Sequence, residues 1–103
     1  MEIRFSPGRW VGNQWACISI TPPAAYHYHV FKPLLAYLAS TYGFELPRIA
    51  PMLDGYAADF CLLGSEATLQ ADNWDVSLAF EQDAVRDQVL AHLQSQPTGF
   101  LLN

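Results

Sequence analysis

Histidine and cysteine are the side chains here that most readily bind metals or attack substrates, and their spacing supports neither role strongly. His27 and His29 form an HxH motif beside two tyrosines, while His92 lies far along the chain. Residues two apart in a helix point in nearly opposite directions, so chelation would need an extended segment and a third ligand that the sequence does not identify. Metal binding or hydrolysis through His27 and His29 is therefore the third-ranked function, and no metal site is predicted.

The two cysteines lie in separate strand-like segments without CxxC spacing. Neither Cys17 nor Cys61 has a basic cluster beside it that would favour the thiolate. We expect two free thiols in a reducing compartment. The sequence also contains no GxSxG, P-loop or GxGxxG motif, so no catalytic residue and no cofactor is predicted.

One pair of carboxylates could be compared with a hydrolytic site. The strands predicted below place Asp59 and Asp75 on the same sheet face, about 9 to 10 Å apart at the backbone, which resembles the spacing of an inverting glycosidase pair. A flat, wet sheet does not exclude water from such a pair. We therefore interpret these acids as binding residues.

The segment 56–80 predicts the elements that carry these residues. Apolar side chains alternate through three short runs, separated by the pairs 64–65 and 72–73, which is typical of a three-stranded antiparallel meander. With both pairs as two-residue turns, all the apolar side chains share one face, and a one-residue slip would scramble them. The predicted opposite pairs include Leu62–Ala67, Phe60–Leu69, Ala71–Trp74 and Leu69–Val76.

Two earlier strands, starting near Ile3 and Trp15, form a second predicted hairpin. A turn at Gly12-Asn13 places Phe5 opposite Ile20 and Trp10 opposite Trp15. A turn at 6–9 would shorten the first strand and lose the tryptophan pairing. We favour the first arrangement, because it gathers the apolar residues on one face and leaves Pro7 on an edge strand.

Two helices are predicted around the meander. Apolar residues at three- and four-residue spacing run from Phe31 to Tyr42 with a stop at Gly43, and Pro33 either lies near the helix start or kinks it. The segment 44–55 is expected to be irregular. A second helix follows Glu81 and continues to about Ser95. The apolar tail from Pro97 onward docks on the body, adds an edge strand or binds a partner.

Together these elements predict one α+β domain over residues 1–103. The order ββαβββα favours a two-layer sandwich, in which two helices cover one face of an antiparallel sheet of about five strands. The opposite face is then open to water or to a partner. The N-terminal residues do not resemble a signal sequence, and no run approaches the about 20 apolar residues of a membrane span, so we expect a cytoplasmic protein.

Charge is divided unevenly between the two halves of the chain. Residues 1–53 carry four basic and two acidic residues, a net of +2, whereas residues 54–103 carry one basic and eight acidic residues, a net of −7. A negative field repels nucleic acid and anionic membranes, and it speeds association with a basic protein. The acidic residues could alternatively serve only to keep a small domain in solution.

The predicted open face mixes aromatic, small and acidic side chains, as binding surfaces do. We predict that its tryptophans anchor a protein partner and that its acids steer a basic one; the predicted contact residues are Trp10, Trp15, Asp59, Glu66, Gln70, Asp72 and Asp75. Alternatively, the tryptophans stack and are covered by the C-terminal tail. In the second-ranked function, the open face closes a homodimer and has no catalytic activity.

The layout of the central segments resembles a known class of proteins. FKPLLAYLASTYGFELP (31–47), DGYAADFCLLG (54–64) and ATLQADNWDVSLAFE (67–81), followed by a closing helix, are similar to small acidic bacterial α+β proteins of uncharacterised or toxin-immunity type. The likeness covers about residues 30–95 and transfers no functional residues. It implies stoichiometric binding to a partner, and if that partner were a nuclease toxin, the acidic half would mimic the phosphate backbone.

Overall fold

The computed structural model describes residues 3–21, 29–72, 75–97 and 99–101. Its elements follow the order ββαββββα, which confirms an α+β chain but adds one strand to the five expected. The elements are β1 (Arg4–Arg9), β2 (Ala16–Thr21), α1 (Phe31–Tyr42), β3 (Ile49–Met52), β4 (Gly55–Leu62), β5 (Ser65–Ala71), β6 (Val76–Phe80) and α2 (Asp83–Gln94). Neither helix is long and apolar enough to cross a membrane.

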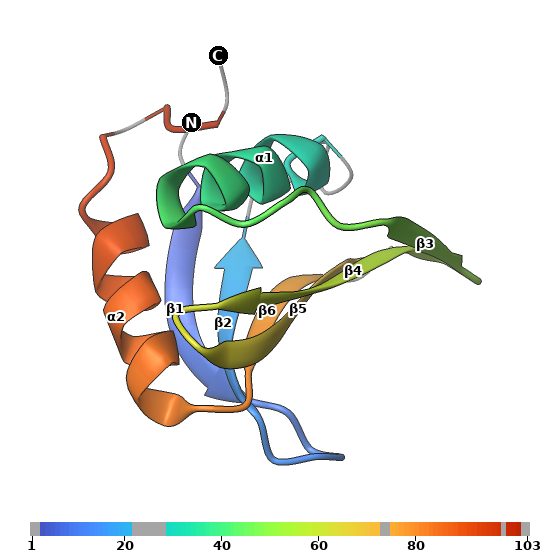
Figure 1. The fold of residues 1–103 in the computed structure, drawn as a ribbon, viewed down its shortest axis with the longest axis horizontal. Coiled ribbons are helices and arrows are strands. Elements are labelled where there is room, and N and C mark those ends of the chain that lie inside the picture. The colour runs from blue at the N-terminus through green and yellow to red at the C-terminus, as the bar shows by residue number, and fades with distance from the viewer. Residues whose placement is uncertain (1–2, 22–28, 73–74, 98, 102–103) are drawn as a thin grey trace.

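The six strands form one antiparallel sheet in the order β1-β2-β6-β5-β4-β3. Alternate strand residues such as Ile18, Leu69 and Leu78 point to one face, where they meet Leu34 of α1 and Val89 of α2 in a single buried cluster. Both helices therefore pack on the same face, as Figure 1 shows. We call this the inner face and its opposite the outer face.

The first helix begins close to its proline. Phe31 is its first residue, so Pro33 lies in the first turn, where backbone N–H groups have no partner within the helix and a missing N–H costs little. The helix therefore starts near Pro33, which was one of the two expected positions. Gly43 ends it with a φ of 74°, and its N–H donates to the Ala39 carbonyl oxygen.

The expectation of an irregular segment at 44–55 is wrong, because this segment contains β3. Pro51 lies in this strand, opposite Tyr56 of β4. The strand is at the edge of the sheet, where one side of the backbone needs no ladder hydrogen bonds and proline is tolerated. Gly55 begins β4 so close to β5 that a Cβ there would lie 1.8 Å from the Ala71 carbonyl oxygen.

The meander keeps its predicted faces but not its predicted register. Phe60, rather than Leu62, lies opposite Ala67, and Ala71 lies opposite Val76 instead of Trp74. Each register is thus shifted by two residues. An even shift leaves every side chain on its original face, so the apolar layer survives while the pairs within it change.

Contacts with the start of α2 account for the first shift. Ser65 is fully buried, and its hydroxyl oxygen accepts the backbone N–H of Gln82 at 3.1 Å. The Gln82 side-chain amide donates in turn to the Gly64 carbonyl oxygen. These bonds hold Ser65 in the strand, so the turn falls on Leu63 and Gly64, at φ of 51° and 79°.

The first hairpin has the favoured register. Phe5 lies opposite Ile20, and the Trp10 N–H donates to the Trp15 carbonyl oxygen at 2.9 Å. The alternative turn at 6–9 is wrong, because those residues belong to β1. The connection spans residues 11–14 and takes its positive φ, 63°, at Gln14.

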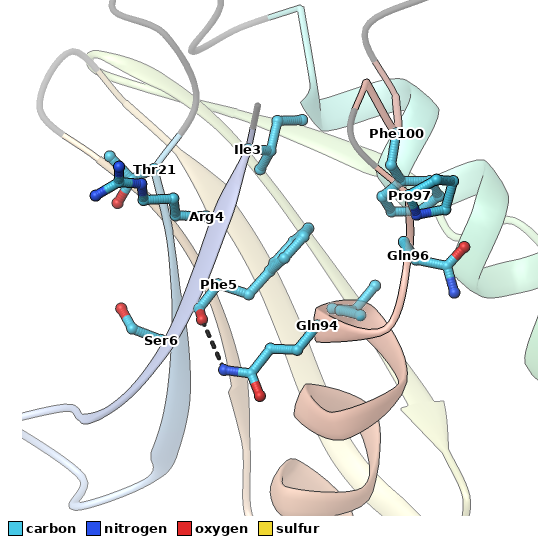
Figure 2. Close-up of a pocket in the computed structure, with 10 residues that line it drawn as sticks. Ile3, Arg4, Phe5, Ser6, Thr21, Gln94, Gln96, Pro97 and Phe100 are labelled. Carbon is cyan, nitrogen blue, oxygen red and sulfur yellow. Dashed lines mark hydrogen bonds between the residues drawn. The ribbon is translucent and has the colours of Figure 1, made fainter. Parts of the chain in front are cut away.

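The C-terminal tail docks on the helix side of the molecule. The Phe100 ring lies 4.8 Å from the Tyr37 ring and 6.3 Å from the Phe5 ring, measured between centroids. Figure 2 shows Phe5 of β1 and Phe100 of the tail, which line the same hollow. The described tail residues thus pack toward the inner face, and none of them supports the alternative in which the tail covers the tryptophans.

We expect Leu63→Asn to stabilise the fold. The substitution creates an Asn-Gly turn at two positive-φ positions, where Leu is strained and Asn is favoured. The free energy of unfolding should rise by about 0.5 to 1 kcal/mol in urea titrations. Leu53→Asn, at the fully exposed tip of the β3–β4 hairpin, is the matched control and should change little. A lower stability for Leu63→Asn would contradict the turn geometry.

Candidate functional site

Two stacked tryptophans dominate the outer face. The indoles of Trp10 and Trp15 are nearly parallel, at an interplanar angle of 9°, with ring centroids 6.5 Å apart. The Trp10 Nε1–H donates to the Ser77 hydroxyl oxygen on β6 at 2.9 Å. This bond fixes the Trp10 indole over β2 and β6.

Small side chains form a floor beneath these rings. Cys17, Ala79 and Thr68 follow one another across β2, β6 and β5, and they are only 7%, 0% and 6% exposed, although both helices lie on the other face. Trp10 reaches Ser77, which lies beyond this row on β6, so its indole passes over the floor. The tryptophans therefore roof part of the outer face.

A depression of about 590 Å³ opens beside the roof, over β4 and β5. We call it the acidic depression. It brings together five of the seven residues predicted to contact a partner, from strands far apart in sequence. Its lining comprises Trp10, Asn13, Trp15, Asp59, Phe60, Cys61, Glu66, Ala67, Thr68 and Gln70.

Two carboxylates give the depression its charge. Asp59 lies opposite Thr68, and Glu66 opposite Cys61, so the two acids are diagonal neighbours on adjacent strands, about 7 to 8 Å apart at the backbone. Both are exposed, and among the described residues neither carboxylate has a hydrogen-bond or ion-pair partner. Such a pair can accept donors from a cation without first losing another contact.

The other two predicted acids lie outside the depression. Asp72 and Asp75 bracket the β5–β6 connection, where the Asp72 carboxylate accepts the Asp75 N–H at 2.9 Å. The suggested pairing of Asp59 with Asp75 is wrong, because the two-residue shift places Thr68 next to Asp59 and moves Asp75 to the sheet end. In this structure the two residues shape the connection.

Two arginines fasten the tryptophan hairpin to α2. Arg86, with a side chain 12% exposed, donates to the carbonyl oxygens of Gly8 and Cys17 at 2.8 and 3.0 Å. Arg9 bonds both Asp83, at 2.8 Å, and the Gln14 carbonyl oxygen, at 2.7 Å. The hydrogen bond from Arg9 holds the pKa of Asp83 below its usual value. The helix layer thus positions the outer-face aromatics.

Thr68 is a site residue that the sequence did not single out. Its Oγ1 atom is the only buried side-chain nitrogen or oxygen in the described part of the chain that has no hydrogen-bond partner. Burying such a group costs about 1 to 3 kcal/mol. Alternation placed Thr68 on the outer face, but its burial depends on aromatic side chains from another hairpin, which no local pattern reveals.

The residues considered for metal binding lie elsewhere. His29 is exposed just before α1, and His27 lies outside the described residues. His92 is 2.6 Å from the Tyr37 hydroxyl oxygen, between the two helices. Within the described ranges, no group of three or more His, Cys, Asp or Glu side chains could hold a metal ion. Cys17 and Cys61 are free thiols, the first buried and the second exposed.

A second hollow, of about 600 Å³, separates β1 from the end of α2. Figure 2 shows the Gln94 side-chain amide donating to the Phe5 carbonyl oxygen across it, at 3.0 Å. Among the described residues that line it, Arg4 alone is ionisable. This hollow lies where the tail packs against β1 and α2. The described residues around it form no cluster suited to catalysis or to binding a charged ligand.

We expect Thr68→Val to stabilise the protein. Valine keeps the shape of threonine and removes the hydroxyl that lacks a partner, so the free energy of unfolding should rise by about 1 kcal/mol. Thermal and urea unfolding would measure the change. Thr21→Val, at an exposed position of β2, is the control and should have a smaller effect. A clear loss of stability in Thr68→Val would mean that the hydroxyl is satisfied in solution.

Comparisons with known proteins add no relative to this description. The sequence matches no protein-family model, and searches of curated proteins and of solved structures find nothing similar. The residues of the outer face are therefore the basis for assigning a function.

Proposed function

We propose that this chain is a small protein-binding module that engages a basic partner through its outer face. The observation that carries the proposal is the acidic depression, where a fixed tryptophan pair borders two carboxylates without partners among the described residues. Aromatic anchors beside charged groups are typical of interface centres. The net charge of −5 for the whole chain favours a cationic partner.

The size of the sheet suggests which further residues would take part. Six strands spaced about 4.8 Å apart and about 18 Å long offer roughly 400 Å², and a standard interface takes about 800 Å² from each partner. The loop 11–14 borders the tryptophans, and Val11 within it is 89% exposed. This loop is the nearest extension of the surface, so we expect it to contribute to the interface.

A toxin-neutralising role is the specific form of binding that we propose. An inhibitor acts by occupying its target, so it needs a rigid, charged surface and no catalytic group. Here the rigid part is the hairpin held by Arg9 and Arg86, and the charge comes from Asp59 and Glu66. A basic toxin would be attracted to that surface by long-range steering as well as by contact.

Capture from the source cell, followed by association kinetics, tests the proposal. Immobilised protein should retain a basic protein at low salt and release it as salt rises, because the charges are exposed. The double variant Asp59→Asn with Glu66→Gln should lower the association rate of the captured protein by about 3- to 10-fold at low salt, with a smaller effect on dissociation.

A double variant with the same charge change serves as the control. Asp54→Asn with Glu45→Gln also removes one aspartate and one glutamate, and both residues are exposed outside the depression. It should leave association close to that of the unaltered protein. If no basic protein is retained, or if the two double variants slow association equally, the acidic depression is not the binding surface.

A homodimer is the second candidate function, and a separate apolar surface favours it. Beyond α1, the β3–β4 hairpin extends away from the helices (Figure 1). Around it Leu53 is 100% exposed, Leu46 65% and Tyr56 44%. A hollow of about 620 Å³ lies between Tyr56 and the start of α1. Exposed apolar residues gathered in this way are typical of protein contacts.

Sedimentation equilibrium at micromolar concentration tests this candidate. If the hairpin surface closes a dimer, Leu53→Lys should raise the dimer dissociation constant at least about 10-fold, because it places a charge in an apolar contact. Val11→Lys, an equally exposed position at the other hairpin, should leave the constant unchanged. A monomer at every concentration would rule the homodimer out.

A further inference from the structure

We propose that the acidic depression receives a single arginine side chain of the partner. This inference rests on the proposed function and adds the chemical group that is recognised. Three independent features of the depression support a guanidinium: an aromatic wall, a pair of free carboxylates and a buried hydroxyl that lacks a partner. The aromatic wall comes from the β1–β2 hairpin, whereas the carboxylates and the hydroxyl come from β4 and β5. The meeting of these two hairpins is a property of the tertiary structure.

The aromatic wall is rigid. Trp15 stacks on Trp10, and Trp10 is held by Ser77, so neither ring is free to turn. Cations are attracted to the face of an aromatic ring, and tryptophan gives the strongest such contacts. A guanidinium also stacks in parallel on an indole, which an ammonium cannot do.

The carboxylates differ from other acids of this protein in having no partner. The Asp83 and Asp87 carboxylates are bonded to Arg9 and Arg86, whereas Asp59 and Glu66 have no such bond among the described residues. Because Asp59 and Glu66 are diagonal neighbours, their carboxylates lie too far apart for a single small cation to contact both closely. The broad, forked guanidinium presents donors on several edges and can bond both.

The third feature is the Thr68 hydroxyl, an acceptor for which no protein donor is present in the described chain. It belongs to the lining of the acidic depression. Because Thr68 is only 6% exposed, we expect a thin, flat donor to fit against it more readily than a bulky one. A guanidinium has that shape and N–H donors to spare, while the three donors of a lysine ammonium surround a compact, strongly hydrated centre.

Titration with short peptides tests the inference. The probes are capped glycine-serine peptides with one central arginine, lysine or citrulline, added to isotope-labelled protein at low ionic strength. The indole N–H signals of Trp10 and Trp15 report binding by NMR. The arginine peptide should bind about 3- to 10-fold more tightly than the lysine peptide. The citrulline peptide keeps the shape without the charge and should bind too weakly to measure.

Three variants link the preference to the residues named. Asp59→Asn with Glu66→Gln should weaken the binding of the arginine peptide about 10-fold, while the control Asp54→Asn with Glu45→Gln should change it by no more than about twofold. Thr68→Val should weaken it about threefold without lowering the melting temperature. Trp15→Leu should remove the preference for arginine over lysine, and if it fails to fold, Thr68→Val and the carboxylate double variant carry the test.

The outcomes separate this inference from the proposed function. Equal binding of arginine and lysine peptides that still depends on Asp59 and Glu66 would overturn the arginine site and leave the acidic surface intact. Unchanged arginine affinity in Thr68→Val would also overturn it. If the site and control double variants behave alike, both the arginine site and the proposed function fail.

Discussion

Burial of one sheet face beneath both helices is the constraint on which the other features of this protein depend. Side chains alternate along each strand, so every residue that joins Leu69 and Leu78 in the core has neighbours that point the other way. With α1 and α2 on the inner side, no helix of the described residues covers the outer side. The aromatic roof, the floor of small residues and the acidic depression all follow from that division.

Two tryptophan side chains, rather than a further helix or strand of the described chain, cover part of the outer face. Trp10 spans the sheet to Ser77, and the small residues beneath it leave room for an indole. This arrangement buries Thr68 without giving its hydroxyl a partner. In the site that we propose, stability and recognition oppose one another at Thr68, because the hydroxyl that weakens the fold is also an unused acceptor in the depression.

Both edges of the sheet discourage growth by strand addition. Pro7 lies in β1 and Pro51 in β3, and each removes one backbone donor from an outermost strand. The association that we propose therefore uses side-chain surfaces. The protein offers two of these, the acidic depression and the apolar β3–β4 hairpin, and they suit partners of opposite chemistry.

Much of this architecture could be predicted from alternation and spacing, and the misses have identifiable physical causes. The faces of the strands, the limits of α1 and the pairing of Trp10 with Trp15 follow from local patterns. The β5 register does not, because a shift of two residues preserves every face and the bonds from Gln82 to Ser65 and Gly64 select between the alternatives. The strand β3 was missed because it contains Pro51. A proline is compatible with a strand only at a sheet edge, and the sequence does not show which strand lies there.

The sequence by itself determined which side chains are apolar, which alternate and where the acidic charge accumulates, because these depend on residue type and period alone. It brought Trp10, Trp15, Asp59, Glu66 and Gln70 to one face. Only the tertiary structure decided that these five surround one depression, that Asp72 and Asp75 stand outside it and that Thr68 is enclosed there. Distances between strands depend on register and on contacts from remote segments, and neither is encoded in a local pattern.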